Sequence, residues 1–146
     1  MRNIVLDGES LGYADLRALS RDFLQREVKL RIHPEAERKV RRSRAVVEKA
    51  IRQGRTIYGI NTGFGNFADV RIPADQLDTL QVNLLRSHAA GVSDPLPAPV
   101  VRATMALRAN VLAKGFSGIR VEPLELLIEM LNRGVHPRVP SRGSVG

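Results

Sequence analysis

Apolar residues recur three or four positions apart in four long stretches of the chain, and this spacing predicts four amphipathic helices, at residues 34–53, 73–88, 99–114 and 123–133. Each stretch begins at a proline, which suits the first position of a helix because the N–H group that it lacks would have no partner there. A glycine, the residue that most often ends a helix, follows each stretch within three residues. A shorter helix is expected at Tyr13–Leu19.

Short strands are predicted at Ile4–Leu6 and at Val28–Ile32, where apolar and basic residues alternate. The apolar residues within 57–60 indicate a third short strand. The proline-rich residues 93–99 are typical of a linker-like turn. The buried face of the third long helix is expected to comprise Ala103, Leu107 and Val111. The sequence therefore predicts a mainly α fold with a few short strands and an aliphatic core.

A glycine-rich stretch, Thr56–Phe67, carries the candidate chemistry. It reads T-I-Y-G-I-N-T-G-F-G-N-F, and its three glycines allow the backbone to turn tightly or to lie against a ligand. Tyr58 at its entrance has a phenol that can accept or donate a proton; a tyrosine buried beside a surface turn is the alternative. The match of Gly63–Ala68 to the dinucleotide fingerprint G-x-G-x-x-A is set aside, because that fingerprint opens a helix whereas this sequence is extended and then broken at Pro73.

The charge balance raises a second class of function. The 146 residues include 23 Lys and Arg against 15 Asp and Glu, which gives a net charge of +8. The densest basic stripe lies on the helix at 34–53 and comprises Arg38, Arg42, Lys49 and Arg52. Such a stripe is either a solvated helix face or a nucleic-acid surface, and no aromatic residue is interleaved with it to stack on bases.

Composition excludes several other kinds of site. The sequence has no cysteine, so disulfides and thiolate chemistry are absent. Its three histidines are scattered without the spacing of metal ligands, and no metal site is expected. No apolar run has the length of a membrane span or of a signal peptide, so a cytoplasmic protein that binds no membrane is expected.

Four short motifs follow one another along the chain: Y-G-I-N-T-G-F-G at Tyr58–Gly65, S-H-A-A-G at Ser87–Gly91, G-F-S-G-I-R at Gly115–Arg120 and G-S-V-G at Gly143–Gly146. Together they resemble the histidine ammonia-lyase family, the bacterial branch of the aromatic amino acid ammonia-lyases. The first motif is specific, and the order of all four makes the resemblance strong. It implies that residues 1–146 are the N-terminal segment of a largely helical ammonia-lyase, which removes ammonia from L-histidine to give urocanate.

The resemblance also implies roles for individual residues. The tyrosine that matches Tyr58 is the base that takes the β-proton of the substrate, and the histidine that matches His88 lines the pocket around the substrate ring. Asn61 and Gly65, in the first motif, are expected to contact the substrate. Without the resemblance, a histidine in the last turn of a helix would be read as a favourable cap.

The cofactor and the assembly also follow from the resemblance. The electrophile of the family, a methylidene-imidazolone, forms from an Ala-Ser-Gly triplet, which does not occur in this sequence and is expected just after Gly146. Family members combine residues from neighbouring subunits, so a homotetramer that acts on a small amino acid, and binds no nucleic acid, is expected.

The substrate and the outcome of the reaction stay open. The pair His88-Ala89 favours histidine as the substrate, because tyrosine-type members usually carry His-Leu there; a tyrosine ammonia-lyase is the alternative. An aromatic aminomutase, which returns the ammonia to the β-carbon, has the same motifs. A basic helical module that binds nucleic acid is the candidate from another class, and such a module does not require the Tyr58 loop.

Overall fold

The computed structural model describes residues 2–21 and 27–143, which divide into two units. The first unit comprises residues 1–45 and 95–139, and the second comprises residues 46–94 and 140–146. The chain therefore leaves the first unit within its longest helix, returns to it at residue 95, and passes back into the second unit after residue 139.

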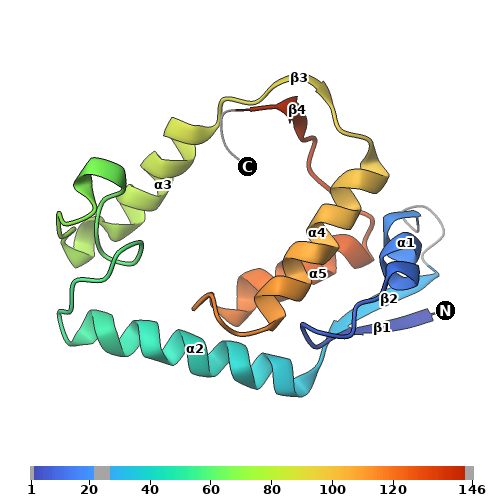
Figure 1. Cartoon of the computed structure of the whole chain (residues 1–146), viewed down its shortest axis with the longest axis horizontal. Coiled ribbons are helices and arrows are strands. Elements are labelled where there is room, and N and C mark those ends of the chain that lie inside the picture. Colours follow the sequence, from blue (N-terminus) through green and yellow to red (C-terminus); the bar gives the residue numbers. More distant parts are fainter. Residues whose placement is uncertain (1, 22–26, 144–146) are drawn as a thin grey trace. The chain divides into compact units, whose positions relative to one another are not determined.

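The first unit begins with a β-α-β element. Strands β1 (Arg2–Leu6) and β2 (Val28–Ile32) pair in parallel over all five residues, and helix α1 (Tyr13–Arg21) lies in the connection between them (Figure 1). A parallel pair needs such a crossover because the chain must return to the same end of the sheet before the second strand begins. All three elements are confirmed, and β1 and α1 each extend two residues beyond the predicted bounds.

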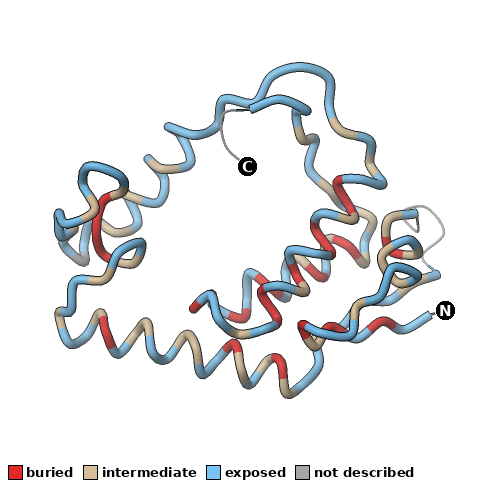
Figure 2. The backbone as a smooth tube through the Cα atoms, viewed as in Figure 1, coloured by how far each residue is buried: buried red, intermediate tan, exposed pale blue. Residues whose placement is uncertain are grey.

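Three long helices complete the first unit: α2 (Pro34–Arg52), which continues into the second unit, α4 (Ala98–Ala113) and α5 (Val121–Asn132). Helix α4 packs against α1, α5 and β1, while α5 packs against β2. All three helices begin and end within two residues of the predicted positions. Figure 2 shows that the buried positions of this unit follow α4, α5 and the two strands, so the core lies between the helices and one face of the strand pair.

The buried face of α4 differs from the predicted one. Leu107 and Val111 are 48% and 51% exposed and Ala103 is half-buried, so the prediction of that face is wrong. The helix carries apolar residues on most of its circumference, and periodicity alone could not choose a side. The residues that are buried instead are Val101, Arg102, Met105, Ala106, Ala109, Leu112 and Ala113.

An arginine lies on that buried face because two helix ends supply its partners. Arg102 is 2% exposed; its Nε donates to the carbonyl of Leu19 and its Nη2 to the carbonyl of Leu131, each at 3.1 Å. These carbonyls belong to the last turns of α1 and α5, where backbone oxygens lack partners within the helix and attract a cation. Arg102 therefore ties α4 to the ends of both neighbouring helices.

A side-chain amide pairs with the backbone of β2. Asn132, the last residue of α5, accepts a hydrogen bond from the N–H of Leu30 at 2.8 Å and donates one to its carbonyl at 3.0 Å. Leu30 is the central residue of β2 and is 1% exposed. Because a buried backbone group without a partner is costly, Asn132 takes the place that a further strand would occupy at this edge.

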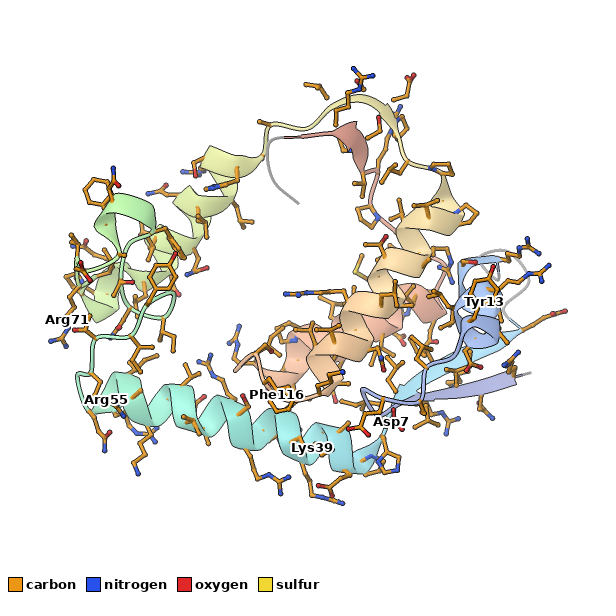
Figure 3. The ribbon with its side chains drawn as sticks, viewed as in Figure 1. Asp7, Tyr13, Lys39, Arg55, Arg71 and Phe116 are labelled. Atoms are coloured by element: carbon orange, nitrogen blue, oxygen red, sulfur yellow. The ribbon has the colours of Figure 1, made fainter. Side chains whose placement is uncertain are left out.

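The turn after β1 is organised by a carboxylate, and Figure 3 labels this residue, Asp7. Its Oδ1 accepts hydrogen bonds from the N–H groups of Glu9 at 2.8 Å and of Ser10 at 2.7 Å. Because these bonds stabilise the charged form, the pKa of Asp7 is lowered to about 2.

The second unit contains α3 (Leu77–His88), preceded by two 3-10 turns (Gly65–Phe67 and Ala74–Gln76), and the paired strands β3 (Val92–Pro95) and β4 (Pro140–Arg142). The predicted helix is confirmed from the fifth of its residues onward. The linker predicted beyond it is wrong in its first part, because β3 finds a partner far along the chain that no local pattern reveals. No residue of α3, β3 or β4 is buried, as their pale tube in Figure 2 shows.

Candidate active site

The glycine-rich loop after α2 is held by one buried side chain. Asn61 is 4% exposed; its Oδ1 accepts a hydrogen bond from the N–H of Ile57 and its Nδ2 donates to the carbonyl of Arg55, each at 2.8 Å (Arg55 is labelled in Figure 3). The N–H groups of Ile60 and Asn61 also bond to the carbonyl of Ile57. The strand predicted at 57–60 is therefore wrong: the backbone groups with which a strand would pair are bonded within a turn.

A second anchor of this loop is Thr62, which is 1% exposed. Its Oγ1 accepts a hydrogen bond from the N–H of Gly59 at 3.3 Å and donates to the carbonyl of Gly63 at 2.9 Å. The returning chain adds a β-bridge between Thr62 and Arg71 and a bond from the N–H of Gly63 to the carbonyl of Val70 (Arg71 is labelled in Figure 3). The shape of the loop is thus set by directional polar contacts.

The three glycines of the loop serve two different purposes. Gly59 and Gly65 have φ angles of +74° and +57°, a left-handed conformation that glycine adopts without strain. Gly63 is needed for close packing instead, since a Cβ atom there would lie 2.6 Å from the Cβ atom of Phe67. A larger residue would clash with Phe67 at position 63 and would strain the backbone at positions 59 and 65.

This path turns Tyr58 outward. Its side chain is 63% exposed, and its ring meets that of Phe64 edge to face, with the ring centroids 6.0 Å apart. Tyr58 lines an open depression of about 600 Å³. The other residues that line it are Phe64, Leu84, Leu85, His88 and Ala89. An apolar surface with a few polar atoms is the usual composition of a site for a small organic molecule.

His88 enters the same depression from the end of α3. Its Nδ1 lies 2.9 Å from the carbonyl oxygen of Leu84, one helical turn earlier, and 2.9 Å from Oγ of Ser87. Helical spacing brings Leu84 and Leu85 to the same face as His88, because residues three and four positions apart are neighbours on a helix. The end of α3 therefore contributes both apolar surface and one imidazole to the depression.

The structure brings together two of the four predicted site residues. Tyr58 and His88 line one depression, although the sequence places them far apart. Asn61 lies buried in the loop, and Gly65 is exposed, with no atom within 4 Å of the place that a Cβ atom would take; neither residue lines the depression. Four lining residues were not among the predicted site residues: Phe64, Leu84, Leu85 and Ala89. Phe64 and Ala89 belong to the motifs that carry Tyr58 and His88, and Ala89 enters the prediction only through the choice of substrate.

The third glycine motif, Gly115–Arg120, packs within the first unit. The N–H of Gly118 bonds to Oγ of Ser43 at 3.0 Å, and a Cβ atom at Gly115 would lie 2.7 Å from the backbone of Lys39. These contacts give the motif a packing role against α2, while Phe116 stands 88% exposed (Figure 3). The fourth motif lies outside the described residues, apart from its first glycine.

The basic stripe of α2 is compensated in part by acidic residues of the same helix. Arg38 and Arg42 both pair with Glu35, and Arg41 pairs with Glu37 at 2.6 Å. The hydrogen bond from Arg38, ahead of the attraction of the nearby charges, holds the pKa of Glu35 below its ordinary value. Two of the four arginine and lysine side chains predicted to form the stripe therefore already have anionic partners.

Within residues 2–21 and 27–143, no group of three or more side chains from His, Asp and Glu is gathered as metal ligands would be. No helix in this same part of the chain combines the length and the apolar character needed to cross a bilayer.

Comparison with known proteins gives consistent matches. The family model for aromatic amino acid lyases matches residues 11–146. A histidine ammonia-lyase from Anaeromyxobacter sp. (strain K) is 53% identical over 146 residues, which are 100% of this chain and 28% of that protein. This chain thus spans little more than a quarter of the length of the curated relatives that it matches.

Solved structures give the same result for the fold. The crystal structure of histidine ammonia-lyase from Trypanosoma cruzi is 42% identical and superimposes with a TM-score of 0.86, over 100% of this chain and 27% of that one. The structure of tyrosine aminomutase from Streptomyces globisporus is 34% identical with a TM-score of 0.88, over 97% of this chain and 26% of that one.

Proposed function

Since the chain belongs to the aromatic amino acid lyase family, we propose that it is the N-terminal segment of a histidine ammonia-lyase, which eliminates ammonia from L-histidine to give urocanate. The mainly helical fold agrees with this assignment, because its solved relatives superimpose on essentially the whole chain. The activity belongs to the complete protein, of which this segment supplies one part of the active site.

The meeting of Tyr58 and His88 in one depression is the observation that carries this proposal. In the proposed role, Tyr58 takes the β-proton of the substrate through its phenol oxygen, which is exposed enough to be reached. His88 contacts the substrate ring. Asn61 would then serve mainly by holding the loop that presents Tyr58, since its amide already bonds to the backbone of Arg55 and Ile57.

The electrophile has to come from another part of the protein. A methylidene-imidazolone would form from an Ala-Ser-Gly triplet following Gly146, and when present it would draw electrons from the substrate and make the β-proton easier to remove. This segment contributes the base and the ring contact beside it. Leu84, Leu85 and Phe64 would exclude water from the apolar part of the substrate.

The assembly and location proposed for the complete protein are a homotetramer in the cytoplasm. Support for the assembly comes from apolar side chains that the segment leaves exposed: Leu85 is 72% exposed on α3, and Leu107 and Val111 are about half exposed on α4. Exposed apolar surface of this kind is typical of a face covered by further polypeptide. The remaining sequence and neighbouring subunits would supply that cover.

An aromatic aminomutase is the second candidate, because a solved tyrosine aminomutase also superimposes on this chain, with a TM-score of 0.88. The fold alone does not separate the two activities, because histidine ammonia-lyase superimposes almost equally well at 0.86. Sequence identity favours the lyase, at 53% and 42% for the two histidine ammonia-lyases against 34% for the aminomutase.

The test is a comparison of substrates and products for the complete enzyme. We expect L-histidine to be deaminated with a higher kcat/KM than L-tyrosine or L-phenylalanine, with urocanate and free ammonia in equal amounts. A β-amino acid as the main product would identify an aminomutase, and a preference for tyrosine would contradict the proposed substrate. Residues 1–146 alone should be inactive, because they lack the Ala-Ser-Gly triplet.

A further inference from the structure

One nitrogen of the His88 ring is fixed by its neighbours. Nδ1 lies 2.9 Å from the carbonyl oxygen of Leu84. A carbonyl oxygen can only accept a hydrogen bond, so Nδ1 has to carry a hydrogen at this distance. In the other neutral tautomer the lone pair of Nδ1 would face a lone pair of the carbonyl oxygen, which is repulsive.

Ser87 favours the same tautomer. Its Oγ donates to the carbonyl of Leu84 at 2.9 Å, so its hydrogen points away from the imidazole. Oγ also lies 2.9 Å from Nδ1 of His88, where only its lone pairs remain available. The Leu84 carbonyl and the Ser87 hydroxyl thus both accept from Nδ1–H.

We infer, on the basis of the proposed function, that Ser87 is a positioning residue which, with the Leu84 carbonyl, holds His88 as the Nδ1–H tautomer, so that Nε2 accepts a hydrogen bond from the substrate ring. The described residues supply no hydrogen bond to Nε2, so its lone pair is available within the depression that Tyr58 shares. The tautomer of a histidine follows from the bond that its other nitrogen makes.

This arrangement specifies a class of substrate. A nitrogen that only accepts requires an N–H or O–H group on the ring that it faces. The imidazole of histidine and the phenol of tyrosine have such a group, whereas the ring of phenylalanine has none. A substrate without the donor leaves Nε2 unpaired and is selected against.

The tautomer of His88 can be determined by spectroscopy, without measuring turnover. In the complete enzyme labelled with ¹⁵N-histidine, solid-state NMR at about pH 9, above the ordinary titration range of histidine, distinguishes protonated from bare ring nitrogens. The signals that disappear in the His88→Phe variant are those of His88. We expect a protonated Nδ1 and a bare Nε2 in the parent, and a smaller excess of this tautomer in Ser87→Ala, where only the Leu84 carbonyl still favours it. A protonated Nε2 in the parent would overturn the inference.

The preference for a substrate ring that donates a hydrogen bond can be measured with a substrate analogue of matched size. In β-(4-thiazolyl)alanine a sulfur replaces the N–H of imidazole, while the other ring nitrogen is kept. The ratio of kcat/KM for histidine over this analogue should fall at least about fivefold in His88→Phe, because an unpaired acceptor is no longer left behind. Comparing the same two substrates in both enzymes cancels their intrinsic difference in reactivity. An unchanged ratio would show that Nε2 of His88 does not accept a hydrogen bond from the substrate ring.

The role of Ser87 is tested by a pair of variants, one that removes its hydroxyl and one that keeps a hydroxyl. Ser87→Ala should lower the histidine-to-analogue ratio by about 2- to 10-fold, the net worth of one hydrogen bond. Ser87→Thr should restore it, since a threonine hydroxyl also bonds to carbonyls of the preceding turn. A ratio that Ser87→Ala leaves unchanged would remove Ser87 from this role. Failure of the parent to deaminate histidine would instead contradict the proposed function, and the NMR result would still stand or fall by itself.

Discussion

Tyr58→Phe tests the proposed base with the smallest possible change. The substitution removes one oxygen and keeps the ring, so the edge-to-face contact with Phe64 is retained. The structure records no hydrogen bond to the Tyr58 hydroxyl from the described residues, and the side chain is 63% exposed. The free energy of unfolding should therefore change by no more than about 0.5 kcal/mol, as for an ordinary surface substitution.

The effect on catalysis should be much larger. If the phenol oxygen takes the β-proton, kcat in the complete enzyme should fall at least about 100-fold, the low end for a general base. That corresponds to about 2.7 kcal/mol in the activation barrier. The assay is release of ammonia from saturating L-histidine, together with thermal unfolding of the same preparations.

The chain offers a matched control, because it contains only two tyrosines. Tyr13 lies on α1 in the first unit (Figure 3) and is 81% exposed, so Tyr13→Phe makes the same chemical change at a residue that does not line the depression. It should leave both kcat and the unfolding temperature unchanged. Turnover of Tyr58→Phe within a few-fold of the parent would exclude Tyr58 as the base, and a large drop in its unfolding temperature would show that the hydroxyl has a structural role.

Substitutions at three further residues test other parts of the site and the fold. His88→Phe should lower turnover of histidine and raise the relative acceptance of phenylalanine by about 5- to 150-fold, the worth of ~1–3 kcal/mol for one unpaired polar group, which kinetics on both substrates measure. Asn132→Asp loses the donor to the Leu30 carbonyl and sets a negative charge against it, so the free energy of unfolding should fall by about 1–3 kcal/mol, as denaturant titration measures, while Asn132→Gln should recover part of it. Because the pKa of Asp7 is lowered from 3.8 to about 2 on folding, its stabilisation is complete above about pH 4 and is lost as the pH falls towards 2. Asp7→Asn should therefore lose less stability than the parent over that interval in unfolding curves, and an identical pH dependence would contradict the assigned cause.

The boundaries of the helices could be predicted because they depend on local chemistry. Proline at the start and glycine after the end act through the backbone of the same few residues, and α2, α4 and α5 begin and end within two residues of the prediction. Which face of α4 is buried depends on its neighbours instead. The buried Arg102 donates to carbonyls 83 and 29 positions away, and no window of sequence around it contains that information.

The candidate site, too, could be predicted only in part from the sequence. Tyr58 and His88 could be proposed from motifs, but the turn that presents Tyr58 has the sequence pattern of a strand, because Ile57 and Ile60 are residue types that strands favour. The amide of Asn61 overrides that preference by bonding to backbone groups four and six positions earlier. Local side-chain bonds of this kind compete with pairing between strands.

The site lies in the unit that buries the fewest apolar side chains, and this has a physical reason. Apolar burial stabilises a fold without fixing direction, whereas hydrogen bonds fix the orientation of each group that they join. Asn61 and Thr62 are almost fully buried and each bonds on both its donor and its acceptor side, so the loop keeps one shape although Tyr58 above it is mostly exposed. On the α3 side of the depression, a hydrogen bond between Nδ1 of His88 and the Leu84 carbonyl fixes the orientation of the imidazole in the same way. Because polar contacts within the loop fix its shape, the Tyr58 ring and the leucines of α3 remain free to contact a substrate, as the proposed active site requires.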